Sequence, residues 1–222
     1  MQTFNQKQNL ERYPKVLVGC PTSFHKDYCL KQYIQGLNKL TYPRKDILLI
    51  ENSQNNEYLN LIENFEIPVE KGPWFKGAIQ RIITSRNILR KKVLDEGYDF
   101  FLSLEQDVIP PKDIIERMLR HAKHVVSGIY FLDEKLTAKA FPLTKEQLWD
   151  DPGLYEIGSA GLGCVLIHRS ILESIEFRSE NKEFDDRFFY KDCKEKEIPI
   201  FCDTSIKCKH LTKEMHWETI EK

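Results

Sequence analysis

The feature that most constrains the fold is a regular alternation of short apolar runs with longer amphipathic stretches. Several runs are continuously apolar, which is typical of strands that helices cover on both faces. Strands and helices in this order favour a Rossmann-like α/β class with a largely parallel sheet. The expected strands are Lys15–Gly19, Asp46–Glu51, Phe100–Leu104, Val125–Phe131, Cys164–His168 and Pro199–Cys202, and the expected helices are 25–39, 77–96, 111–123, 169–175 and 186–197.

The chain length predicts one domain. Its 222 residues are close to the size of a single domain, so we expect one unit over 13–212 between a polar tail at 1–12 and a C-terminal tail at 213–222. Residues 133–157 show no clean period. A stretch of this length between strands is usually a functional or mobile loop, and we expect one here.

The charge balance argues against a general affinity for polyanions but says little about a local basic patch. Lys and Arg number 33 against 34 Asp and Glu, so the whole chain has no strong attraction to nucleic acid or to an anionic membrane. No apolar run approaches the roughly 20 residues of a membrane-spanning helix. Residues 1–12 lack the apolar core of a secretory signal, so we expect a cytoplasmic protein, with peripheral membrane contact left open. The six cysteines are expected to be buried, reduced thiols.

Two carboxylates follow an apolar predicted strand. The run FFLSL leads into Glu105 and Asp107 and stops at a Pro-Pro pair. In an extended chain, residues i and i+2 project to the same side, so both carboxylates point out from the carboxyl edge of the sheet. A divalent ion such as Mg²⁺ or Mn²⁺, bound to a diphosphate, would relieve their repulsion. The alternative is a pair of solvated carboxylates at a strand end.

A charge interrupts the apolar face of the helix predicted at 77–96. Arg86 falls on the stripe formed by Ile79, Ile82, Ile83, Leu89 and Val93. A cation that faces the sheet needs an anion or several acceptors. Arg86 could pair with a carboxylate such as Glu105 or lie beneath a nucleotide, and the alternative is an arginine that extends from the edge of the stripe to water.

Two further segments contain candidate catalytic or metal-binding residues. Asp185 and Asp186 stand at the start of a predicted helix, where one can serve as a cap and the other is available as a general base. His210 follows the last strand and is either a metal ligand or a loop histidine. The glycine-rich segment before Cys164 does not match the dinucleotide fingerprint, and the P-loop, the nucleophile elbow and the common zinc-protease motif are absent.

Taken in order, these features resemble the GT-A fold of nucleotide-sugar-dependent glycosyltransferases, family two in particular. The resemblance runs from about Lys15 to His210. It rests on the segments KVLVGCPTS, ILLIENS, TSRN, FFLSLEQDVIPP, GLGCVLIHRS, FDDRFFY and DTSIKCKH. It implies a mostly parallel, mixed sheet flanked by helices.

The resemblance also implies a role for each matched residue. Asp107 would hold Mn²⁺ or Mg²⁺ as the last residue of the family's D-x-D signature, and His210 matches its late metal-binding histidine. Glu105, which replaces the first Asp of that signature, would contact the ribose or assist the metal. The residues matched to nucleotide binding are Pro21, Thr22, Ser23, Glu51, Asn52 and Arg86. The catalytic base would come from the pair Asp185 and Asp186.

The implied reaction moves a sugar, with a hexose expected, from a UDP- or GDP-sugar to an acceptor hydroxyl. The acceptor is a glycan, a lipid-linked group, a protein or a modified nucleotide. A single carboxylate base favours inversion at the anomeric carbon, although a retaining enzyme shows a similar motif order. Two alternatives remain: a nucleotidyltransferase that makes sugar nucleotides, and a non-catalytic nucleotide- or glycan-binding module. Trp74 and Trp149 are further candidates for stacking on a sugar.

Overall fold

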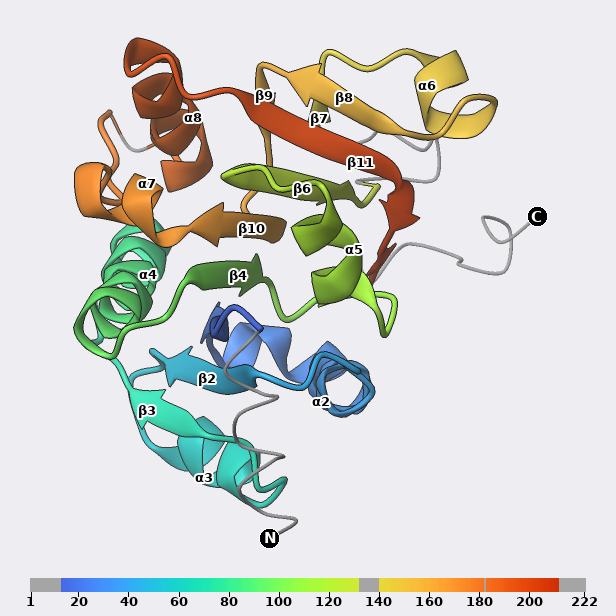
Figure 1. The fold of residues 1–222 in the computed structure, drawn as a ribbon. Coiled ribbons are helices and arrows are strands. Elements are labelled where there is room, and N and C mark those ends of the chain that lie inside the picture. Colours follow the sequence, from blue (N-terminus) through green and yellow to red (C-terminus); the bar gives the residue numbers. More distant parts are fainter. Residues whose placement is uncertain (1–12, 132–139, 182, 212–222) are drawn as a thin grey trace, which may run out of the picture.

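The computed structural model describes residues 13–131, 140–181 and 183–211. Eight of the described strands form one mixed sheet (Figure 1). Four neighbouring pairs in it are parallel and three are antiparallel. In spatial order the strands are β3 (Val69–Lys71), β2 (Lys45–Glu51), β1 (Val16–Thr22), β4 (Phe100–Leu104), β10 (Cys164–His168), β6 (Val125–Ile129), β11 (Ile200–Lys207) and β8 (Leu154–Ile157). This arrangement confirms the predicted fold class.

Helices cover both faces of the sheet, so the molecule has three layers. On β4, Phe101 packs on one face while Leu102 packs on the other, which explains why the strand is continuously apolar. The first face lies beneath α4 (Ala78–Asp95), α7 (Arg169–Ser174) and α8 (Asp185–Glu195). The second lies beneath η1 (Phe24–Cys29), α2 (Leu30–Asn38), α3 (Glu57–Glu63) and α5 (Ile114–Arg120).

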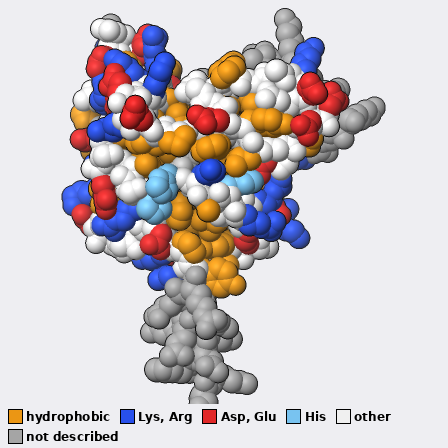
Figure 2. Space-filling model, turned by 45° about the horizontal axis from the view of Figure 1, so that its top comes forward, with side chains coloured by type: hydrophobic (Ala, Val, Ile, Leu, Met, Phe, Trp, Pro, Cys, Tyr) orange, Lys and Arg blue, Asp and Glu red, His pale blue; other side chains and the backbone are white. Residues whose placement is uncertain are grey.

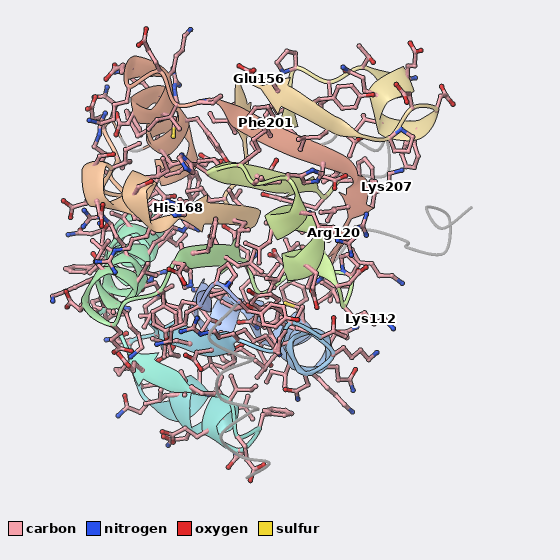
Figure 3. All side chains as sticks on the ribbon, in the orientation of Figure 1. Lys112, Arg120, Glu156, His168, Phe201 and Lys207 are labelled. Carbon is pink, nitrogen blue, oxygen red and sulfur yellow. The ribbon has the colours of Figure 1, made fainter. Side chains whose placement is uncertain are left out.

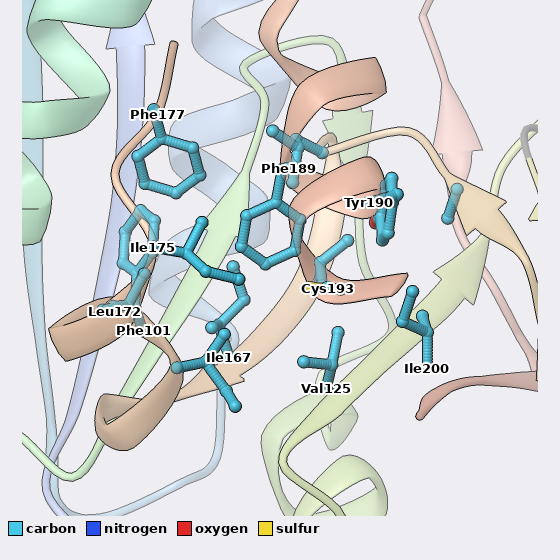
Figure 4. Close-up of a cluster of buried hydrophobic side chains, with 14 of the residues drawn as sticks. Phe101, Val125, Ile167, Leu172, Ile175, Phe177, Phe189, Tyr190, Cys193 and Ile200 are labelled. Carbon is cyan, nitrogen blue, oxygen red and sulfur yellow. The ribbon is translucent and has the colours of Figure 1, made fainter. Parts of the chain in front are cut away.

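An aromatic cluster fixes α8 against the sheet. Figure 4 shows Phe177, Phe189 and Tyr190 packed with aliphatic side chains from β6, β10 and α7. The rings of Phe177 and Phe189 are stacked with centroids 5.6 Å apart. Aromatic pairs of this kind contribute about 0.5–1.5 kcal/mol beyond their burial. The cluster therefore holds the first residues of α8 in one place relative to the central strands.

The segment predicted as a loop at 133–157 contains regular structure in its described part, so that prediction was wrong for residues 140–157. It comprises β7 (Ala140–Phe141), α6 (Lys145–Trp149) and β8. A capping box starts α6, in which Thr144 and Gln147 bond each other's backbone amides. The sequence period was obscured because these elements are short. Residues 133–139 and both predicted tails, 1–12 and 213–222, fall outside the described residues. The last residue of the predicted domain, Thr212, does so too.

Two small strand pairs complete the fold. β7 pairs with β9 (Ser159–Ala160), and β5 (Val108–Ile109) pairs with β12 (Lys209–His210). The second pair is antiparallel and sets His210 opposite Val108. It therefore brings the end of the described chain beside the residues that follow β4.

The described surface carries charges of both signs. Figure 2 shows acidic and basic side chains interspersed around the edge of one face, with hydrophobic side chains between them. Lys112, Arg120 and Lys207 lie around α5 and the end of β11 (Figure 3).

No helix among the described residues is long and apolar enough to cross a membrane. All six cysteines are buried, as predicted.

An acidic side chain stabilises an irregularity in β11. The register with β6 shifts between Asp203 and Lys207. The buried carboxylate of Asp203 accepts hydrogen bonds from the Ser205 amide at 2.9 Å and lies 2.8 Å from His121 Nε2. Desolvation opposes the charge, but these hydrogen bonds lower the pKa of Asp203 below its ordinary value of 3.8.

We expect Asp203→Asn to lower the free energy of unfolding by about 1–3 kcal/mol at neutral pH, because hydrogen bonds to a buried carboxylate are worth that much. Since the folded-state pKa of Asp203 is depressed, its contribution is complete above the unfolded-state pKa and is lost as the pH falls through the folded-state value. Urea unfolding of both proteins from neutral pH down to about pH 3 measures the difference. A difference that does not shrink on acidification would contradict this account.

Candidate active site

The carboxyl ends of three parallel strands form the floor of a cleft. β1, β2 and β4 end side by side at Thr22, Glu51 and Leu104. The cleft beyond them has a volume of about 560 Å³. Ten of the eleven predicted site residues line it: Pro21, Thr22, Ser23, Asn52, Arg86, Glu105, Asp107, Asp185, Asp186 and His210. Segments up to nearly two hundred residues apart in the chain therefore meet at one place.

The three residues after β4 divide between the cleft and the core. Glu105 and Asp107 both line the cleft. Gln106 between them is buried, with its side chain held by the Thr22 hydroxyl, by the Tyr58 hydroxyl at 2.8 Å and by the Lys26 carbonyl at 2.6 Å. Gln106 thus joins the ends of β4 and β1 to η1. This role was not predicted, and the expectation that residues 105–107 are extended was wrong: they form a turn, in which the Val108 amide donates to the Glu105 carbonyl at 2.9 Å.

Arg86 is buried at 1% exposure and pairs with two carboxylates. Its Nη1 contacts Asp185 Oδ2, and its Nη2 lies 3.2 Å from Glu105 Oε1. The pairing with Glu105 confirms the interpretation that Arg86 pairs with a carboxylate, and its burial excludes an arginine that extends to water. Desolvation opposes the guanidinium charge, but Asp185 and Glu105 raise the pKa of Arg86 above its ordinary value. Glu105 itself has a raised pKa, because desolvation outweighs the effect of Arg86.

The apolar stripe around Arg86 is only partly buried. Leu89 and Val93 are fully buried, as the helical period predicts. Ile79, Ile82 and Ile83 are half-buried, and Ile82 lines the cleft. The first turns of α4 therefore face a cavity instead of the sheet. The stripe was correctly placed for the second half of the helix and wrong for the first.

Asp107 lies between a histidine and a lysine. Its Oδ2 contacts Lys26 Nζ and lies 3.4 Å from His210 Nε2. The other ring nitrogen of His210, Nδ1, is 2.7 Å from the Phe131 carbonyl oxygen, which orients the ring. Although desolvation opposes ionisation, the hydrogen bond with His210 and the Lys26 charge lower the pKa of Asp107 below its ordinary value. Asp107 is consequently a carboxylate.

Asp107 and His210 form a donor set that suits a divalent ion. Asp107 Oδ1 is buried and has no hydrogen-bond partner among the described residues. A carboxylate oxygen and an imidazole nitrogen both bind Mn²⁺, and an outer carbonyl on the other ring nitrogen is usual for a ligating histidine. No cluster of three or more His, Cys, Asp or Glu residues surrounds one point in the described chain. Ions of this kind take only one or two protein carboxylates when phosphates supply the rest.

All but one of the predicted nucleotide-binding residues line the same cleft. The Asn52 amide donates to the Thr22 carbonyl at 2.9 Å, and Asn52 Nδ2 donates to Ser85 Oγ at 3.0 Å. Glu51 is the exception, because it does not line the cleft. Its buried carboxylate pairs with Lys71 at 2.6 Å and accepts from the Ser53 amide. The inward direction of its side chain at the end of β2 could not be read from the motif alone.

The two acidic residues of α8 differ in environment. Asp185 is 3% exposed and pairs with Arg86. Asp186 is half-buried and accepts a hydrogen bond from the Arg187 amide at 2.8 Å. Phe184, which is 54% exposed, takes the position before the helix, so neither aspartate is the N-cap residue. Both line the cleft, but Asp185 is already neutralised by a buried cation.

The tryptophans proposed for sugar stacking do not line this cleft. Trp149 stacks on Phe131 with ring centroids 5.4 Å apart and lies under Lys207. Trp74 borders a second pocket that shares Ser23, His25 and Arg81 with the cleft. Trp149 therefore serves packing, whereas Trp74 borders an extension of the cleft past the end of β1.

Neither a protein-family model nor the sequence of a curated protein matches this chain. Solved structures do match it. S. aureus TarS 1–349 has a TM-score of 0.58 at 12% identity, over 90% of this chain and 58% of that chain. Its complex with UDP-GlcNAc has a TM-score of 0.61 at 13% identity, over 90% and 60%. Protein A197 from STIV has a TM-score of 0.52 at 18% identity, over 90% and 86%.

These structural matches cover nearly all of the described sheet and helices, and this chain spans about three fifths of the TarS fragment. At such low identity the likeness concerns the course of the backbone. Together with the strand order and the two-sided helix layers, it shows that the chain has the Rossmann-like GT-A fold.

Proposed function

We propose that the chain is a glycosyltransferase that moves a sugar from a nucleoside-diphosphate sugar to an acceptor hydroxyl with inversion. The observation that carries the proposal is the convergence on one cleft of Asp107 with His210, of the Arg86 pair, and of the half-buried Asp186. A module that only bound nucleotide would not need a carboxylate base beside a metal-binding pair. The UDP-GlcNAc complex of TarS, which has the same fold, supports a UDP-sugar as the first donor class to test.

Asp107 and His210 would hold Mn²⁺ or Mg²⁺, which supplies positive charge for the departing diphosphate. Asp186 accepts the proton of the acceptor hydroxyl. The acceptor oxygen then forms a bond to the anomeric carbon while the bond from that carbon to the phosphate oxygen breaks. The nucleoside diphosphate leaves with the electron pair. Arg86 holds Glu105 and Asp185 in place at the cleft floor, so the charges there are fixed before the donor binds.

Donor binding and turnover provide the direct test. We expect UDP- or GDP-sugars with Mn²⁺ to raise the melting temperature, because a ligand that binds only the folded state stabilises it. The productive donor is then incubated with glycan, lipid-linked, protein and nucleoside acceptors, and transfer is followed by mass spectrometry. Pyrophosphate release from a nucleoside triphosphate plus a sugar phosphate would instead identify a nucleotidyltransferase. Binding without transfer or donor hydrolysis would identify a binding module.

We expect Asp186→Asn to reduce the transfer rate by about 10²- to 10⁴-fold, because it removes the proton acceptor and keeps the side-chain shape. Donor affinity, measured by calorimetry, should stay within about threefold, since a general base acts on the acceptor. Asp185→Asn is the matched variant on the adjacent residue. It should lower stability through the loss of its pair with Arg86. Asp186 would be rejected as the base if Asp186→Asn transferred normally.

A further inference from the structure

Lys26 places a positive charge on the predicted metal ligand. Its Nζ contacts Asp107 Oδ2, the same oxygen that lies 3.4 Å from His210 Nε2. The Lys26 side chain is 35% exposed at the cleft wall, whereas the Asp107 side chain is 5% exposed. A buried carboxylate is costly without a compensating cation, and Lys26 supplies that cation in this structure.

The backbone of Lys26 is fixed, although its ammonium group can move. The Lys26 carbonyl accepts from Gln106 Nε2 at 2.6 Å, and the Lys26 amide donates to the Ser23 carbonyl at 2.9 Å. Gln106 is the direct neighbour of Asp107, so the lysine is tethered to the acidic motif through the motif's middle residue. A lysine has a flexible four-carbon stem, which allows Nζ to change partner while the backbone stays in place.

A divalent ion held by Asp107 and His210 would lie close to the Lys26 ammonium group, which contacts the same carboxylate, and the two cations would repel each other at that distance. An arriving donor brings a diphosphate into the same cleft, and Lys26 lines that cleft. The negative oxygens of a diphosphate offer the ammonium group a new partner as strong as the one it gives up.

We propose that Lys26 is a built-in counter-ion of the metal site, which holds Asp107 when no divalent ion is bound and moves to the diphosphate when donor and ion bind together. Lys26 is in this sense a positioning residue that makes metal binding depend on the donor. The inference rests on the proposed function, since it presumes a diphosphate ligand. It predicts two opposite consequences of removing the lysine charge.

The first consequence concerns the metal alone. Lys26→Met keeps the length of the stem and removes the charge. We expect it to bind Mn²⁺ about tenfold more tightly than the unchanged protein in the absence of nucleotide, equivalent to about 1.4 kcal/mol, because the ion no longer displaces an ammonium group. Calorimetry and the electron paramagnetic resonance signal of free Mn²⁺ measure this affinity. Lys31→Met, an exposed lysine of α2, is the matched control and should bind Mn²⁺ as the unchanged protein does.

The second consequence concerns the nucleotide. With saturating Mn²⁺, we expect Lys26→Met to bind UDP and GDP about tenfold more weakly, because the diphosphate loses a charged partner. A merely structural role would weaken both affinities, and that result would overturn the proposal, as would an unchanged Mn²⁺ affinity. If neither protein binds Mn²⁺, the counter-ion role and the metal assignment both fail, while nucleotide binding still decides the proposed function. If the unchanged protein binds neither UDP nor GDP, the proposed function itself fails.

Discussion

Asp107→Ala is expected to lower the rate of sugar transfer by about a thousandfold or more, since a group that stabilises a developing charge in a closed site is worth roughly 10²–10³ and the same change removes a metal ligand. The variant takes away a carboxylate that contacts both His210 and Lys26. Lys26 and His210 then lose the carboxylate oxygen that they share. Initial rates at fixed donor and Mn²⁺ concentrations measure the loss.

The control for this variant is Asp27→Ala, in which an exposed carboxylate one residue from Lys26 is removed without altering the cleft lining. It should transfer sugar at the rate of the unchanged protein. Asp107→Asn separates charge from shape, and it should show nearly the full loss, because a neutral amide is a poor ligand for a hard divalent ion. Transfer by Asp107→Ala within about threefold of the unchanged rate would remove Asp107 from the mechanism.

Arg86→Met is expected to cost about 3–5 kcal/mol of unfolding free energy, the range observed when one partner of a buried ion pair is removed. Arg86 is 1% exposed, and its loss leaves Asp185 buried without a cation. Urea or guanidinium unfolding at neutral pH measures the change. Arg120→Met, at an exposed position of α5, is the matched control and should remain within about 0.5 kcal/mol of the unchanged protein.

A second change separates charge from packing at Arg86. In the double variant Arg86→Met with Asp185→Asn, the buried carboxylate is also neutralised. We expect it to recover at least about 1 kcal/mol relative to Arg86→Met, because the main penalty is an uncompensated charge. If the double variant is less stable than the unchanged protein by the sum of the two single effects, Arg86 acts through packing against Phe177 and not through its ion pairs.

The central strands could be predicted because burial on both faces leaves a local signature. β4 and β10 match the predicted ranges Phe100–Leu104 and Cys164–His168 at both ends, since each is a short apolar run bounded by polar residues. The short elements could not be predicted in the same way. β5, β7, β9 and β12 have two residues each, so no period can develop in them, and they exist only because a partner strand is present.

Some residues of the candidate site could likewise be predicted from local sequence, and others could not. Glu105 and Asp107 both line the cleft, but a turn places them there and not the predicted strand alternation, because β4 ends at Leu104 and the Val108 amide donates to the Glu105 carbonyl at 2.9 Å. Arg86 was identifiable as a buried charge because helical periodicity places it among apolar residues. The roles of Gln106 and Lys26 were not identifiable, since a glutamine in a turn and a lysine in a short helix are ordinary in any sequence. Their long-range contacts distinguish them: Gln106 bonds Thr22, Tyr58 and the Lys26 carbonyl, and the Lys26 ammonium group contacts Asp107.

The sequence by itself determined the α/β class, the central strands and the acidic motif at the end of β4, because each depends on interactions between residues close in the chain. Tertiary structure decided which residues complete the site. Arg86 meets Asp185 across 99 residues, and His210 reaches Asp107 through the pairing of β12 with β5. It also separated Asp185 from Asp186, two neighbours that are chemically identical in the sequence. One is buried against a guanidinium and the other is partly open to the cleft, and only long-range packing sets that difference.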